Sequence, residues 1–224
     1  MSEICYFNII PEELLKYIIS LTENKVYDLC LINHYFNDNC KIIRIIDNFK
    51  YPKLTDVNLK KLINLTSLDL YNNEIITDEG IKGLINLTDL NLSNNHKITN
   101  EGIKGLTNLT SLDLGDNDKI TDEGIKSLIN LTYLDLYENN MVTAIGIKGL
   151  TNLTSLNLYC DDIMTNEGIK GLTNLSFLNL VGNISITDEG IKGLTNLVSL
   201  NLVGNISITD EVIKRLTNLE KLNR

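Results

Sequence analysis

The sequence of 224 residues has no tryptophan, only two prolines and a shortage of positive charge. The scarcity of proline, together with 14 glycines, excludes collagen-like and proline-rich scaffolds. Asp and Glu number 29 against 20 Lys and Arg, and the resulting net charge of −9 argues against a general binder of nucleic acid or membrane surfaces. No apolar run approaches the roughly 18–20 residues of a membrane span. A hydrophobic fraction of 43% is nevertheless enough to bury a core.

Cysteine is also sparse, and the four residues Cys5, Cys30, Cys40 and Cys160 form no C-x-x-C pair. The two histidines stand at no ligand spacing from them, so we expect reduced thiols and no metal site or cofactor. The first residues, Met1–Cys5, have neither the basic start nor the apolar run of a signal peptide. These features predict an intracellular protein, cytoplasmic or nuclear.

A repeat of 22 residues fills most of the chain. Leu68 has an equivalent at every further step of 22 residues, namely Leu90, Leu112, Leu134, Leu156, Leu178, Leu200 and Leu222. One step back, the register falls on Ile46, and residues 54–56 match residues 76–78. We therefore expect a repeat domain over residues 43–224, and a period of this length is typical of a solenoid.

Each repeat combines the signals of a short strand and a short helix. Leu68 and Leu70 alternate with polar residues, which predicts a half-buried strand. Asn73 begins a column of Asn residues, broken by one Asp, that we expect to bond to the backbone where the chain leaves the strand. Thr77 is a good helix N-cap, and Asn86 suits a left-handed residue that ends the helix.

The repeat pattern L-x-x-L-x-L-x-x-N-x-x-I-T-D-E-G-I-x-x-L resembles leucine-rich repeats. Its second half is similar to the cysteine-containing subfamily found in F-box proteins, with Asn at the usual Cys. The resemblance implies an α/β leucine-rich-repeat solenoid, with parallel strands on the concave face and short helices on the convex face. Such repeats serve many partners, so the pattern names no ligand.

Residues 1–42 lie outside the 22-residue register. A helix is predicted after Pro11, and two more short helices are predicted at 25–31 and 33–40. The segment resembles an F-box, because Ile10-Pro11, Glu13-Leu14, Ile18-Ile19-Ser20-Leu21 and Ile32-Asn33-His34-Tyr35-Phe36 stand at the places of that family's motifs. The resemblance implies a small all-α unit that docks a Skp-family adaptor through Ile10, Pro11, Leu14, Ile18, Leu29, Ile32 and Phe36. The alternative is that these helices only cap the solenoid.

The sequence offers no catalytic constellation. Neither His34, in the N-terminal helices, nor His96, in a loop, has a Ser or Cys partner that the register brings close. The Gly-Ile-Lys-Gly copies occupy helix positions rather than a phosphate-binding loop. The column of Asp and Asn that includes Asp69 is interpreted as part of the scaffold. We therefore predict that the protein is not an enzyme.

Two variable columns, which begin at Ser67 and Tyr71, face the concave side and carry four aromatic residues on neighbouring strands. Such a cluster is typical of an interface hot spot, and drift of the repeat without a ligand is the alternative. Nearby acids favour a substrate with a basic segment. The predicted substrate-binding residues are Tyr133, Tyr137, Tyr159, Phe177, Asp113 and Asp135.

The combined interpretation is a substrate-recognition adaptor of an SCF-type ubiquitin ligase, with ubiquitin transfer carried out by other subunits. The alternative is a non-enzymatic interaction module whose first helices only cap the repeats. A secreted or receptor-like repeat protein is a third hypothesis, against which the missing signal peptide speaks. We also expect the last strand, within residues 219–223, to pair with the strand at 197–202, and its charges to keep the chain monomeric.

Overall fold

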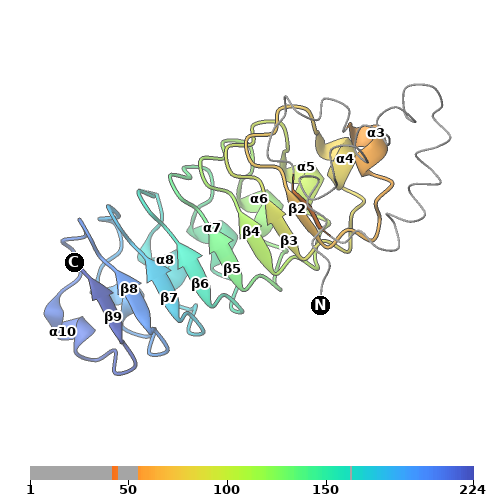
Figure 1. Ribbon diagram of the computed structural model, residues 1–224. Coiled ribbons are helices and arrows are strands. Elements are labelled where there is room, and N and C mark those ends of the chain that lie inside the picture. Colours follow the sequence, from red (N-terminus) through yellow and green to blue (C-terminus); the bar gives the residue numbers. More distant parts are fainter. Residues whose placement is uncertain (1–41, 45–54, 162) are drawn as a thin grey trace, which may run out of the picture.

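A computed structural model describes residues 42–44, 55–161 and 163–224 of the chain (Figure 1). Nine parallel strands form one sheet in chain order. They are β1 (Ile42–Arg44), β2 (Ser67–Asp69), β3 (Asp89–Asn91), β4 (Ser111–Asp113), β5 (Tyr133–Asp135), β6 (Ser155–Asn157), β7 (Phe177–Asn179), β8 (Ser199–Asn201) and β9 (Lys221–Asn223). The helices of the described part, each of one turn, are α3 (Asp56–Leu59), α4 (Asp78–Ile81), α5 (Asn100–Ile103), α6 (Asp122–Ile125), α7 (Ala144–Ile147), α8 (Asn166–Ile169), α9 (Asp188–Ile191) and α10 (Asp210–Ile213).

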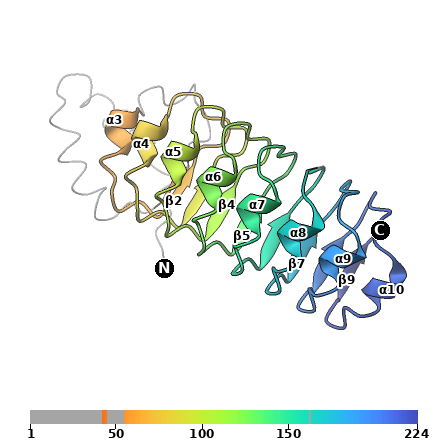
Figure 2. The same cartoon turned by 180° about the vertical axis from the view of Figure 1, so that it is seen from behind.

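The elements form an elongated solenoid, with the strands side by side along one face (Figure 1). Seen from behind, the helices form a parallel row on the opposite face (Figure 2). From β2 onward each residue pairs with the residue 22 positions later, as Leu68 pairs with Leu90. The predicted α/β solenoid with a parallel sheet on one face and short helices on the other is therefore confirmed for the described repeats.

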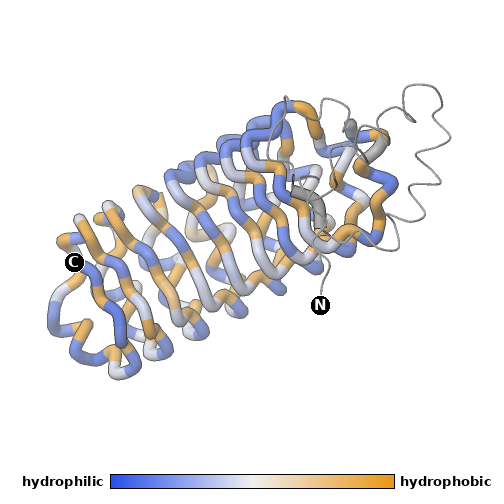
Figure 3. The backbone as a smooth tube through the Cα atoms, viewed as in Figure 1, coloured by the Kyte–Doolittle hydropathy of each residue, from blue (hydrophilic) through white to orange (hydrophobic). Residues whose placement is uncertain are grey.

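The core lies between the sheet and the row of helices, and each repeat contributes six apolar side chains to it. In one repeat these are Ile76, Ile81, Leu84, Leu87, Leu90 and Leu92, all of them buried. Burial of each such side chain contributes about 1.5–3 kcal/mol, and it is complete only when the next repeat stacks on top. The alternating orange and blue of every turn in Figure 3 reflects this pattern of buried and exposed positions.

The buried asparagine ladder predicted from Asn73 is present. In a typical rung, Asn139 accepts hydrogen bonds at Oδ1 from the backbone N–H groups of Met141 and Val142, at 2.9 and 3.0 Å. Its Nδ2 donates to the carbonyls of Leu114 and Asn117 in the preceding repeat, at 2.9 and 3.1 Å. The buried members of the column are Asn73, Asn95, Asn117, Asn139, Asp161, Asn183 and Asn205. One side chain thus both shapes the turn after the strand and joins two repeats.

A second ladder joins the helix N-termini of neighbouring repeats. Asp78, at the start of α4, accepts hydrogen bonds from the backbone N–H and the hydroxyl of Thr99, at 2.8 and 2.7 Å. Thr99 is the N-cap of α5, as predicted, and its Oγ1 accepts from the backbone N–H of Glu101. Gly102 packs so closely on this pair that an added Cβ would lie 2.6 Å from Asp78 Oδ1. The acid of one repeat therefore fixes the N-cap of the next.

The prediction for Asn86 is wrong. Helix α4 ends at Ile81, and Asn86 is not among the residues with positive φ. Its side-chain Nδ2 instead donates to the carbonyl of Ile63 in the preceding repeat, at 2.8 Å. The left-handed residues lie one position before the asparagine ladder, where the chain turns off the strand. They are Asn72, Asn94, Asp116, Glu138, Cys160, Gly182 and Gly204.

The backward extension of the register to Ile46 is also wrong. The residue that pairs with Leu68 is Ile43 of β1, a step of 25 residues rather than 22. The helices keep the 22-residue step, since α3 begins at Asp56 and α4 at Asp78. The three extra residues therefore lie between β1 and α3.

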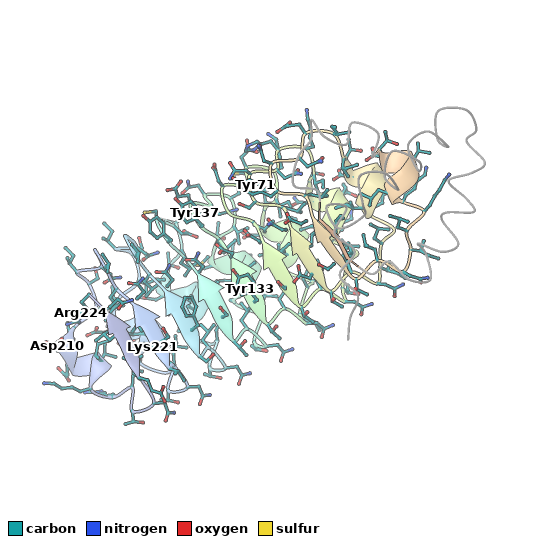
Figure 4. The ribbon with its side chains drawn as sticks, viewed as in Figure 1. Tyr71, Tyr133, Tyr137, Asp210, Lys221 and Arg224 are labelled. Atoms are coloured by element: carbon teal, nitrogen blue, oxygen red, sulfur yellow. The ribbon has the colours of Figure 1, made fainter. Side chains whose placement is uncertain are left out.

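The last strand pairs with its neighbour as predicted. Lys221 of β9 lies opposite Ser199 of β8, and the backbone N–H of Leu202 donates to the carbonyl of Asn223. The side chain of Arg224 reaches past the strand to Asp210 at the start of α10 (Figure 4). The side chains of β9 are exposed.

The predicted adaptor-binding residues Ile10, Pro11, Leu14, Ile18, Leu29, Ile32 and Phe36 lie outside the described residues, as does the whole predicted unit 1–42 apart from Ile42. Over the part of the chain that the structure describes, no helix is long and apolar enough to cross a bilayer. In the same part, no group of three or more His, Cys, Asp or Glu side chains could hold a metal ion.

Candidate functional site

The outward-facing side of the sheet is the candidate site, and we call its three columns of side chains the sheet face. Each repeat from β2 to β8 contributes one residue to each column, because alternate residues along the strand and just after it point away from the core. The first column is Ser67, Asp89, Ser111, Tyr133, Ser155, Phe177 and Ser199. The second is Asp69, Asn91, Asp113, Asp135, Asn157, Asn179 and Asn201. The third, just past the strands, is Tyr71, Ser93, Gly115, Tyr137, Tyr159, Val181 and Val203.

The aromatic residues of the sheet face form one stacked pair and three separate rings, one of which is Tyr71, which is 53% exposed. Tyr137 and Tyr159 lie in adjacent repeats, with ring centroids 4.8 Å apart and an angle of 18° between the planes. Tyr133 and Phe177 lie two strands apart, because Ser155 stands between them in the register. Both of these rings are 39% exposed, and Tyr137 is 40% exposed. Figure 4 shows Tyr133 and Tyr137 on the same part of the solenoid.

The second column has the scaffold role predicted for it. Asp135 Oδ1 accepts a hydrogen bond from the backbone N–H of Tyr137, two residues later, at 2.9 Å. Asn157 makes the same bond with Tyr159, and Asp113 makes it with Gly115. Asn and Asp serve this local turn equally well. The turn therefore does not explain why some repeats carry a charged residue there.

Negative charge is concentrated around β4 and β5. Burial, followed by the charges of Asp135, Asp69 and Asp89, raises the pKa of Asp113 to about 6, against the lowering effect of its bond from Gly115. Burial and the charges of Asp135 and Asp113 also raise the pKa of Tyr133 to about 12. The Tyr133 hydroxyl donates to Asp135 Oδ2 at 3.2 Å. The surroundings of Asp113 thus disfavour the ionised form of its carboxyl group.

We expect Asp113→Asn to raise the free energy of unfolding by about 1–2 kcal/mol at pH 7 and to have little effect near pH 4. The folded-state pKa lies above the ordinary value of 3.8, so the carboxyl group favours the fold only when protonated, and this contribution is lost as the pH rises from about 4 through 6. Urea unfolding at the two pH values measures the difference. Equal stabilisation at both would contradict this titration.

No basic residue of the three columns, from β2 to β8, balances Asp89, Asp113 and Asp135. The three columns contain neither Lys nor Arg from β2 to β8. Within residues 55–161 and 163–224, no ion pair joins Asp89, Asp113 or Asp135 to a cation. These three acids and the aromatic residues from Tyr133 to Phe177 therefore lie together on β3–β7, with the charge of the acids available to a partner.

Models of leucine-rich repeats match the solenoid. The family described as "Leucine Rich repeat" matches residues 61–85, 83–106 and 171–195, and the family described as "Leucine Rich repeats (2 copies)" matches residues 107–149. No curated protein matches the chain significantly.

Several solved structures share the fold. Internalin C2 of Listeria monocytogenes is 29% identical over 76% of this chain and 77% of its own, with a TM-score of 0.59. A chain in the TLR13–ssRNA13 complex is 26% identical over 87% of this chain and 30% of its own, with a TM-score of 0.64. A chain in the yeast Rad7–Elc1 complex is similar in fold alone, at 21% identity over 84% of this chain and 62% of its own, with a TM-score of 0.58.

Proposed function

Because residues 61–149 and 171–195 are leucine-rich repeats, a protein-interaction fold, we propose that this chain is the substrate-recognition adaptor of an SCF-type ubiquitin ligase. The sheet face binds a protein substrate. The segment at residues 10–36 docks a Skp-family adaptor, and other subunits transfer ubiquitin. The role requires no catalytic residue in this chain.

The proposal that the sheet face binds a substrate rests on the exposed aromatic residues of that face. Tyr137 and Tyr159 stack on each other, and Tyr133 and Phe177 are more than a third exposed, although the core is complete without them. Large aromatic residues near the middle of a surface are the residue type that dominates protein interfaces. The acids around them favour a substrate with a basic segment.

The docking half rests on the F-box resemblance of residues 10–36. The alternative is an interaction module whose N-terminal helices only cap the solenoid. It is favoured by the family models, which match the repeats and not the first 60 residues. Both possibilities use the sheet face in the same way.

We expect the full chain to bind a purified Skp-family adaptor in a pull-down, and the double variant Leu14→Asp with Ile18→Asp to lose this binding. Charged residues would disrupt the apolar contact that an F-box makes, while the repeats keep their unfolding midpoint. The matched control is Ile129→Asp, because Ile129 is an exposed isoleucine of the repeats and should retain full binding. Failure of the unaltered chain to bind the adaptor would leave only the alternative.

A further inference from the structure

The first column of the sheet face alternates between serine and a larger side chain. Serine stands at Ser67, Ser111, Ser155 and Ser199, and the residues between them are Asp89, Tyr133 and Phe177. The strand register places Tyr133, Ser155 and Phe177 side by side on β5, β6 and β7. The larger side chains therefore form ribs. We use the word slot for the space above a serine that has a larger residue on each side, which applies to Ser111, Ser155 and Ser199.

The slot above Ser155 lies between two aromatic residues, Tyr133 and Phe177, at a strand spacing suited to stacking. Adjacent strands are about 4.8 Å apart, so the backbones that carry the Tyr133 and Phe177 rings are separated by about 9.6 Å. Two aromatic rings at this separation leave room for one planar group between them. Both rings are partly exposed, and the serine between them projects little beyond the backbone.

The neighbouring slot, above Ser111, is lined by charge. Asp89 on β3 and Tyr133 on β5 flank this slot. Asp113 lies on β4, two residues after Ser111. The Asp135 carboxylate, which accepts from Tyr133, lies between the two slots. The slot above Ser199 differs, because Lys221 flanks it and its neighbours in the second column are asparagines. Of the three slots, those above Ser111 and Ser155 therefore attract a cation, and the slot above Ser199 does not.

A guanidinium group fits both slots better than an ammonium group does. It is planar, it stacks on aromatic faces, and it presents several N–H donors to carboxylates. The two slots lie about 9.6 Å apart across the strands. A polyproline II segment advances about 9.3 Å in three residues and returns to the same side, so residues i and i+3 reach adjacent slots.

Resting on the proposed function of the sheet face, we propose that the substrate is recognised through an extended Arg-x-x-Arg segment that runs across β3–β7. One arginine occupies the slot above Ser111, where it pairs with Asp89 and Asp113. The other stacks between Tyr133 and Phe177 above Ser155. The proposal follows from the alternation of the ribs, the strand register and the uncompensated acids.

The probe is a fluorescent peptide with the core Arg-Pro-Pro-Arg, and its binding to the full chain is measured by fluorescence anisotropy. We expect it to bind more tightly than peptides with the cores Lys-Pro-Pro-Lys and Arg-Pro-Arg. Tyr133→Ala should weaken binding about tenfold, and Ser155→Phe should abolish it by filling the slot. The matched control is Ser127→Phe, at an exposed serine outside the three columns of the sheet face, and it should leave affinity unchanged.

Equal binding of the arginine and lysine peptides, or equal effects of Ser155→Phe and Ser127→Phe, would overturn the proposal. A parallel selection of random peptides on the unaltered chain separates this failure from that of the proposed function. Selected peptides that lack arginine but lose affinity for Tyr137→Ala would refute the arginine slots and keep the sheet face as the binding site. Selected peptides indifferent to every sheet-face substitution would refute both.

Discussion

Asn139→Ala is expected to lower the free energy of unfolding by about 3–5 kcal/mol. The substitution removes one side chain that bonds to four backbone groups, two N–H groups and two carbonyls, in two repeats. The Leu114 carbonyl keeps its hydrogen bond from the backbone N–H of Asn117. Each buried group left without a partner costs about 1–3 kcal/mol, and part of that cost is recovered as the turn relaxes or admits water. Urea unfolding followed by circular dichroism measures the change. Because only neighbouring repeats contact each other, the transition should also broaden.

A substitution at another position of the same column is expected to raise the stability of the fold. Asp161 is buried in the ladder, and its Oδ1 accepts from the backbone N–H groups of Ile163 and Met164, as the asparagines do. Asp161→Asn adds amide N–H donors directed at the carbonyls of Leu136 and Asn139, the groups that lie 25 and 22 residues earlier. We expect it to stabilise the fold by about 1–2 kcal/mol. For Asn139→Ala, a decrease of less than about 1 kcal/mol in the free energy of unfolding would show that the ladder is not a main source of stability.

Gly102→Ala is expected to destabilise the fold by about 2–4 kcal/mol. The new methyl group would lie 2.6 Å from Asp78 Oδ1 and 2.9 Å from a side-chain carbon of Ile98. Asp78 would have to move, and it would then lose its two hydrogen bonds to Thr99. The substitution thus combines overpacking with the loss of a link between repeats.

The matched control is Gly105→Ala, three residues later in the same repeat. An added Cβ there meets no atom within 4 Å, and Gly105 is not among the glycines with positive φ. Alanine should therefore stabilise by up to about 1 kcal/mol through the unfolded chain. Thermal and urea unfolding of both variants give the comparison. Similar values for the two would mean that the close approach of Gly102 to Asp78 relaxes without cost.

Much of the candidate site could be predicted from the sequence, because the columns follow from the 22-residue period alone. Once Leu68 and Leu70 point inward, Ser67 and Asp69 must point outward, and the same holds in each repeat. The membership of Tyr133, Tyr137, Tyr159 and Phe177 in these columns needed no structure. Their mutual arrangement did, because the stacking of Tyr137 on Tyr159 depends on side-chain rotamers that no periodicity encodes.

The sequence by itself determined the repeat, the core, the parallel sheet and the asparagine ladder. The constant period places each residue beside the equivalent residue of the next repeat. A column of apolar residues therefore becomes a buried stack, and a column of Asn residues becomes a hydrogen-bonded ladder. In this respect a local pattern fixes long-range contacts, which is uncommon outside repeat proteins.

Only the tertiary structure decided which side chains form hydrogen bonds between neighbouring repeats. Asp78 lies in the first turn of its own helix, yet its oxygens accept hydrogen bonds from Thr99 of the next repeat. Asn86 appeared suited to a left-handed helix end, yet it donates to a carbonyl of the preceding repeat. Both side chains could bond to groups of the same kind in their own repeat or in a neighbouring repeat. The stacking of the repeats brings the group of the neighbouring repeat within hydrogen-bond distance. The 25-residue step at Ile43 was likewise set by pairing with Leu68, since the pattern of the following helix continues unchanged.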